Sequence, residues 1–159
     1  MRAFTKVVTT IWASERFRSV TDDARLLHLY YMTSHHQTAC GCFLLPDGYA
    51  LADMQWDTDR YQTARTRLVE ADLVAHDART QEVRITRWFE DNPPMNPSHR
   101  KAVDRAIERI NSAQFREQVL AELNALDCEK KAKSPPRNPT TGYSLAQLQP
   151  VLKRGAHLK

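Results

Sequence analysis

The sequence has few of the features that disulfide-rich, membrane-spanning or secreted proteins require. Three of its 159 residues are cysteines, an odd number and too few for a disulfide framework. No apolar run approaches the roughly 20 residues of a membrane-spanning helix. Residues 1–6 lack the apolar stretch of a secretory signal. We therefore expect a globular protein of the cytoplasm.

Glycine is also scarce, and this bears on catalysis. The chain has four glycines, no Gly-rich phosphate-binding loop and no Gly-x-Ser-x-Gly nucleophile motif. The adjacent acids Asp22 and Asp23, like Glu90 and Asp91, are typical of helix caps and turns. The sequence therefore predicts neither an enzyme nor a cofactor.

Positive charge is unevenly distributed along the chain. The net charge is +4, but residues 129–159 hold seven of the 23 basic and one of the 19 acidic side chains. This segment carries +6, and residues 1–128 carry −2. Basic proteins often bind nucleic acid, but here the positions of individual arginines must support that prediction.

Hydrophobic periodicity predicts an α+β fold that is mostly helical. Residues 6–12 favour a strand, and Thr21 is a suitable N-cap for an apolar helix that extends to residue 32. A strand at 40–45 and a helix at 46–54 follow. After a tight break, Asp57 caps a helix over 58–71, and residues 73–77 and 82–88 predict a β-hairpin. This order is that of a winged helix-turn-helix, which we assign to residues 1–91.

Residues 92–128 predict a helical extension, an αα-hairpin whose first helix is capped by Asn96. Its apolar side chains either fold back on the winged helix or pack against a second copy. Two prolines at 93–94 lead the chain away from the hairpin and favour a homodimer, with Val103, Ile107 and Ile110 in its interface. Residues 129–159 predict a flexible basic tail, in which 144–152 could form a short helix.

The helix over 58–71 is the expected DNA-recognition helix. Tyr61, Ala64 and Leu68 form an apolar stripe, and the opposite face carries short polar side chains that suit base edges, with arginines beside them for phosphates. An ordinary solvated surface is the alternative, and Asp59 and Glu70 oppose tight binding. The predicted DNA-binding residues are Thr58, Arg60, Gln62, Thr63, Arg65, Thr66 and Arg67 of the helix and Arg79, Thr80, Arg84 and Arg87 of the hairpin.

Two histidines and two cysteines, His35, His36, Cys40 and Cys42, form an alternative site that would bind zinc. However, one residue between the cysteines is not the usual ligand spacing, and small buried cysteines are common in protein cores. We interpret these residues as loop histidines and core cysteines and expect no metal.

Several segments resemble those of a known family in order and spacing: TIWAS at 10–14, DARLL at 23–27, GCFLLP at 41–46, LVEADLV at 68–74, WF at 88–89 and NPPMNP at 92–97. Together they resemble the amino-terminal domain of phage-type replisome organisers, which are similar in layout to DnaD-type primosome proteins. The resemblance implies duplex DNA binding at a phage or prophage replication origin and a carboxyl-terminal region that engages helicase-loading partners. Two residues depart from the pattern: Asp72 replaces an expected glycine, and Arg65 replaces an apolar residue.

The leading functional prediction is therefore sequence-preferring DNA binding in phage or prophage replication initiation. Two alternatives stay open at this point. The same helix would suit a phage transcription regulator, and the winged helix would also suit a module that binds a host or phage protein.

Overall fold

The computed structural model of the chain describes residues 5–133. Its fold is α+β and mostly helical, as expected. The elements are η1 (Thr9–Ala13), α1 (Glu15–Arg18), α2 (Asp22–Thr33), β1 (Cys42–Leu44), α3 (Asp47–Met54), α4 (Thr58–Glu70), β2 (Val74–Asp77), β3 (Glu82–Ile85), α5 (Trp88–Asp91), α6 (Pro97–Glu108) and α7 (Ala113–Lys133). No helix among these is long and apolar enough to cross a membrane.

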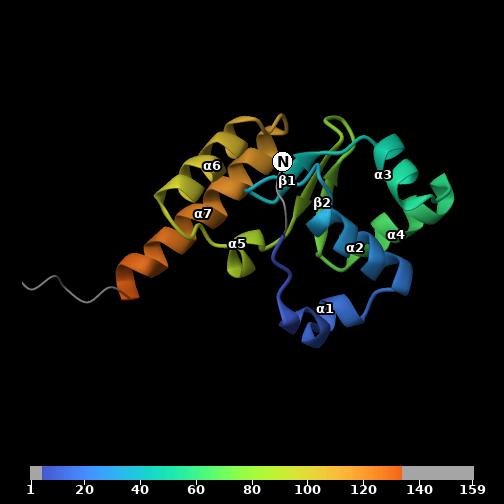
Figure 1. Cartoon of the computed structure of the whole chain (residues 1–159), viewed down its shortest axis with the longest axis horizontal. Helices are drawn as coiled ribbons and strands as arrows, with labels where there is room; N and C mark the ends of the chain where they lie inside the picture. Colours follow the sequence, from blue (N-terminus) through green and yellow to red (C-terminus); the bar gives the residue numbers. More distant parts are fainter. Residues whose placement is uncertain (1–4, 134–159) are drawn as a thin grey trace, which may run out of the picture.

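The three strands form one antiparallel sheet with β3 in the middle, in the order β1-β3-β2. Phe43 of β1 and His76 of β2 both lie opposite Val83 of β3. Figure 1 shows the sheet between α2–α4 on one side and α6 and α7 on the other. All four residues of β3 are buried, because helices cover both faces of the sheet.

Local capping explains where the long helices begin. The side chains of Thr21, Asp57 and Asn96 each accept a hydrogen bond from the backbone N–H three residues further on, at 3.3, 2.8 and 2.8 Å respectively. These bonds satisfy N–H groups that lack a partner inside the helix. The three caps predicted from the sequence are confirmed.

The strand predicted over residues 6–12 is wrong. This part of the chain contains the 3-10 helix η1 and then α1, in which Ser14 is the N-cap. Only Ile11 of η1 is buried, and Trp12 is 62% exposed with its ring edge-on to Phe17 at 5.4 Å. β-branched residues favour a strand only where a neighbouring strand pairs with them, and here none does.

The second predicted strand of the hairpin is also shorter than expected. It ends at Ile85, and Arg87 adopts a left-handed backbone conformation (φ 55°) that starts α5 at Trp88. The indole nitrogen of Trp88 donates to the carbonyl oxygen of Ala39 at 3.0 Å. Trp88 therefore packs against Ala39 and Gly41, just before β1, instead of extending the hairpin.

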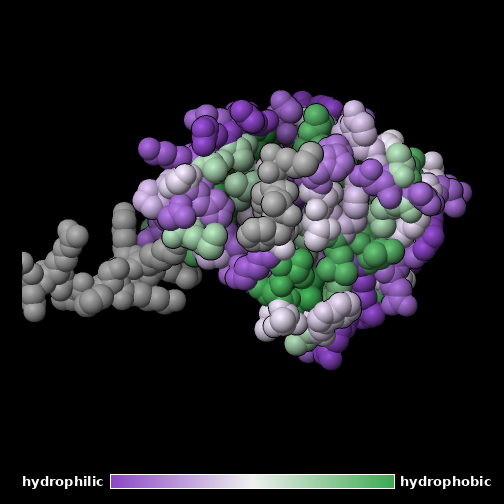
Figure 2. Space-filling view, viewed as in Figure 1, coloured by the Kyte–Doolittle hydropathy of each residue, from purple (hydrophilic) through white to green (hydrophobic). Residues whose placement is uncertain are grey.

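The packing of α6 and α7 contradicts the predicted interface residues of a homodimer. Val103, Ile107 and Ile110 are buried within the chain, where they join Phe115 and Val119 in the same apolar core as the sheet and α2–α4. The part of α6 that is visible in Figure 2 is hydrophilic on its outer side. The helices fold back on the sheet, so these residues are not available to a second copy.

The helix α7 extends further than the sequence predicts. It continues to Lys133, so the first residues assigned to the tail are helical. The rest of the tail, including the short helix considered at 144–152, lies outside the described residues.

Candidate nucleic-acid interface

The helix α4 lies on the core with the face that the sequence predicts. Tyr61, Ala64 and Leu68 are buried, and the side chains of the opposite face are exposed. Those exposed residues are Thr58, Asp59, Gln62, Thr63, Thr66, Arg67 and Glu70. The threonine hydroxyl at 66 donates to the backbone oxygen of Gln62 at 2.9 Å. Within residues 5–133 no hydrogen bond engages the side chains of Gln62 and Thr63.

The helices α2 and α3 hold α4 in place. A tight turn joins α3 to α4, because Gln55 takes a left-handed conformation (φ 53°) and Asp57 caps the next helix. Across the core, the hydroxyls of Tyr31 on α2 and Tyr61 on α4 form a buried hydrogen bond of 2.9 Å. Burial raises the pKa of both phenols, so they stay neutral. This bond fixes α4 against α2.

The guanidinium of Arg60 is engaged inside the chain. Its Nε and Nη2 donate to the two carboxylate oxygens of Asp23 on α2 at 2.9 and 2.6 Å, and it lies 4.3 Å from the ring centroid of Trp56. The hydrogen bond from Arg60 lowers the pKa of Asp23 and raises that of Arg60. A two-point pair of this geometry holds the arginine beside α2, although its side chain stays 46% exposed.

The structure contradicts the prediction that Arg65 contacts DNA. Its side chain is only 14% exposed, and Nη1 donates to Asp47 at the start of α3 at 2.5 Å. The same nitrogen lies 3.3 Å from Nε2 of His76 on β2. Burial and the charge of Arg65 lower the pKa of His76, which favours a neutral ring beside the guanidinium. Arg65 joins α3, α4 and β2 and does not reach an outer surface.

The structure also contradicts the prediction that Arg84 contacts DNA. In β3, Val83 and Ile85 point to one face of the sheet, so Glu82 and Arg84 point to the other, which α6 and α7 cover. Arg84 is 11% exposed and its Nη1 donates to Glu122 of α7 at 2.5 Å. Burial raises the pKa of Glu122, and Arg84 opposes that shift. Arg84 therefore ties the sheet to α7.

The remaining predicted DNA-binding arginines and Thr80 differ in how accessible they are to solvent. Arg79 is exposed at the hairpin loop and has no ion pair within residues 5–133. The hydroxyl of Thr80 is buried. Arg87 faces Glu90 at 4.0 Å, and Arg67 pairs with Glu70 at 2.9 Å, with all four side chains more than half exposed. Exposed pairs of this kind are weak, so these arginines can exchange a carboxylate for a phosphate.

The structure also reveals a basic stripe that the sequence analysis missed. Lys101 and Arg105 on α6 and Arg109, its C-cap residue, recur every four residues and are exposed, and none has an ion pair within the described part of the chain. Arg105 and Arg109 line a groove of about 490 Å³ between α6 and β1, together with Leu44. The four-residue spacing was present in the sequence and indicates one helix face.

The four residues considered for zinc do not come together. Cys40 and Cys42 are buried, and burial raises the pKa of both thiols, so they belong to the core as protonated groups. His35 and His36 instead lie near Asp53 of α3. Burial and the neighbouring His35 ring lower the pKa of His36.

No family model, curated protein or solved structure matches this chain.

Proposed function

We propose that residues 5–91 form a winged helix that binds duplex DNA, with α4 in the major groove. The order of elements from α2 to β3 and the strand order β1-β3-β2 support this fold. The observation that carries the proposal is the outer face of α4. Gln62 and Thr63 are exposed there, have no intramolecular side-chain bond, and lie on a helix held rigid from its opposite face.

The chemistry of this face suits base edges. A glutamine amide can make two hydrogen bonds to adenine, and a threonine offers a hydroxyl to any base and a methyl group to thymine. Arg67 on α4, Arg79 on the hairpin loop and Arg87 at the start of α5 would contact phosphates on either side. All three are exposed; Arg60 is exposed as well, but both of its hydrogen-bonding nitrogens are held by Asp23.

The charge distribution of the protein favours a moderate affinity for DNA. Residues 1–128 carry a net charge of −2, and Arg60, Arg65 and Arg84 are engaged by carboxylates within the chain. Three phosphate contacts give a slope of about −3 in a plot of log K against log salt. The +6 charge of residues 129–159 would add sequence-independent attraction.

On the resemblance to replisome organisers, we propose that this binding serves phage or prophage replication initiation, with helicase-loading proteins as partners of the carboxyl-terminal tail. That tail lies largely outside the described residues. Footprinting on the genome that encodes the chain separates this role from transcription regulation. Protection of origin repeats supports replication, and protection of promoters supports regulation.

A second candidate function is a module that binds another protein. It is favoured by the engaged arginines and by the groove between α6 and β1, whose basic side chains are free of ion pairs within the described residues. In this case the purified protein would bind its partner in nuclease-treated lysate and show no preference among duplexes.

The test of the DNA proposal is Gln62→Ala, with Gln114→Ala on the exposed side of α7 as the matched control. We first select the preferred duplex from a random pool. Gln62→Ala should then weaken binding to that duplex by about 1–3 kcal/mol and leave random duplexes unchanged. Arg67→Ala should weaken all duplexes and reduce the salt slope by about 1. Equal losses for Gln62→Ala on preferred and random duplexes would contradict base recognition by α4.

A further inference from the structure

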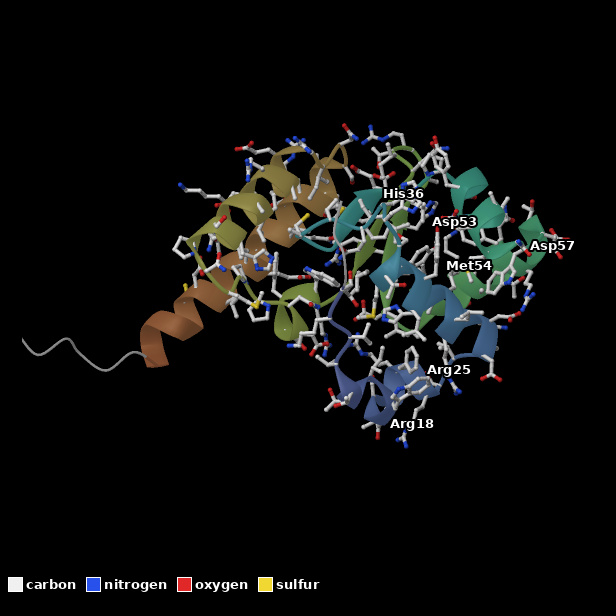
Figure 3. All side chains as sticks on the ribbon, in the orientation of Figure 1. Arg18, Arg25, His36, Asp53, Met54 and Asp57 are labelled. Carbon is white, nitrogen blue, oxygen red and sulfur yellow. The ribbon has the colours of Figure 1, made fainter. Side chains whose placement is uncertain are left out.

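Two histidines and an aspartate from different segments converge beside α3. His35 and His36 belong to the loop between α2 and β1, and Asp53 lies near the end of α3. One potential ligand atom from each residue lies within 4.8 Å of the other two. Figure 3 labels His36 and Asp53 on this side of the molecule. The centroids of the two imidazole rings are 4.0 Å apart.

The surroundings orient two of these three side chains. The hydroxyl of Tyr30 on α2 donates to Oδ2 of Asp53 at 2.7 Å. The ring of His36 lies 5.1 Å from that of Tyr49 on α3. Nε2 of His36 is shielded from solvent and has no hydrogen-bond partner within residues 5–133. A polar atom in this state costs free energy unless another group binds it.

The distances are close to those of a zinc shell. Zinc binds imidazole nitrogen and carboxylate oxygen at about 2.0–2.2 Å, so tetrahedral ligands lie roughly 3.4 Å from one another. The potential ligand atoms lie within 4.8 Å of one another, and side-chain rotations that move them by about 1–1.5 Å bring them to that spacing. His35 is exposed and free to make such a rotation, whereas Asp53 is bonded to Tyr30 and His36 is half-buried. Metal-binding carboxylates also typically accept a hydrogen bond from a neighbouring group, as Asp53 does from Tyr30.

We propose that His35, His36 and Asp53 bind a divalent transition-metal ion of the zinc class, with solvent as the fourth ligand. Two imidazoles and one carboxylate are ligands that Zn²⁺, Co²⁺ and Ni²⁺ accept. The bound ion would tie the loop after α2 to α3, because its ligands come from both. The site is independent of the proposed DNA-binding function.

The experiment titrates Zn²⁺ or Co²⁺ alone into the full chain, without an affinity tag and with Cys128→Ser to remove the exposed thiol. Calorimetry should show one equivalent of Zn²⁺ bound, and Co²⁺ should give a visible absorption band of a nitrogen and oxygen shell. His35→Ala and Asp53→Asn should each weaken binding tenfold or more. Asp53→Asn keeps the side-chain shape and an acceptor for Tyr30, so it tests the charge of the ligand in a folded protein.

The matched controls are His99→Ala on α6 and Asp59→Asn on α4, which should bind the metal like the parent protein. A rise of the thermal midpoint on adding Zn²⁺ should be present in the controls and absent in His35→Ala. The proposal is overturned if the parent chain binds no metal, or if His35→Ala and Asp53→Asn bind as tightly as the controls. It is also overturned if Co²⁺ shows a sulfur-to-metal charge-transfer band that Cys40→Ser or Cys42→Ser removes.

Discussion

At the scale of single residues, His28 is a titratable group in an apolar site. It lies on α2 with its ring 5.8 Å from that of Phe17, and only 5% of the residue is exposed. Its Nδ1 has no hydrogen-bond partner within the described residues. Burial, together with the charge of Arg16, lowers its pKa from 6.5 to about 4. The ring is therefore neutral in the folded protein at neutral pH.

This burial predicts a loss of stability in mild acid. The unfolded chain binds a proton at His28 near pH 6.5 and the folded chain only near pH 4, so the unfolded state gains protons first as the pH falls. The free energy of unfolding should decrease by about 3 kcal/mol between pH 7 and pH 4 from this group. His28→Leu should remove that part of the decrease. Urea unfolding of both proteins over this pH range measures it, and parallel profiles would contradict the prediction.

At the scale of elements, a buried carboxylate docks the helical pair on the sheet. Glu82 of β3 accepts hydrogen bonds from the backbone N–H groups of Asn111 and Ser112 at 2.8 and 2.7 Å. These residues connect α6 to α7, so the carboxylate lies at the amino-terminal end of α7. A negative charge is stabilised at that end by the helix dipole. Glu82 therefore sets where α7 meets the hairpin.

Glu82→Gln tests this contact. The amide keeps one acceptor oxygen but turns an N–H₂ group toward a backbone N–H, which leaves a buried donor without a partner. We expect a decrease of about 1–3 kcal/mol in the free energy of unfolding. Glu108→Gln, on the exposed side of α6, is the control and should have little effect. If the two variants have equal stability in urea, the docking role of Glu82 is wrong.

At the scale of the whole molecule, residues 5–133 share one apolar core. Ile107 on α6 and Val119 on α7 belong to the same buried cluster as Leu27 on α2 and Leu68 on α4. Removing α6 and α7 would expose the face of the sheet that carries Arg84. The elements from α2 to β3 and the helices α6 and α7 therefore depend on each other for stability.

A charge placed in this core should unfold the protein. Ile107→Asp would bury a carboxylate with no cation beside it, and the cost should exceed about 4 kcal/mol, a large part of the stability of a typical domain. We expect loss of the helical circular-dichroism signal and aggregation in light scattering. Arg105→Asp, on the exposed side of the same helix, should stay folded. A soluble, folded Ile107→Asp monomer derived from a wild-type dimer would instead restore the interface predicted from the sequence.

The candidate DNA interface was predictable only in part. The outward position of Gln62, Thr63 and Thr66 follows from helical periodicity around Tyr61, and the structure confirms their exposure. The accessibility of the arginines was not predictable, because charge alone does not show whether a carboxylate lies nearby. Lys101, Arg105 and Arg109 were overlooked even though their spacing is regular.

The sequence by itself determined the features that depend on a few neighbouring residues. Thr21, Asp57 and Asn96 cap helices through bonds that close within three residues, and the turn at Gln55 is equally local. The order of helices and strands from α2 to β3 follows from such signals together with hydrophobic periodicity.

Only the tertiary structure decided which surfaces stay open. Arg65 meets Asp47 across 18 positions and Arg84 meets Glu122 across 38, and Asp53 approaches His35 and His36 through the packing of α3 beside the loop after α2. The apolar face of α6 meets the sheet of its own chain for the same reason. Contacts between distant segments depend on how whole elements pack, and no local pattern of residue types specifies that packing.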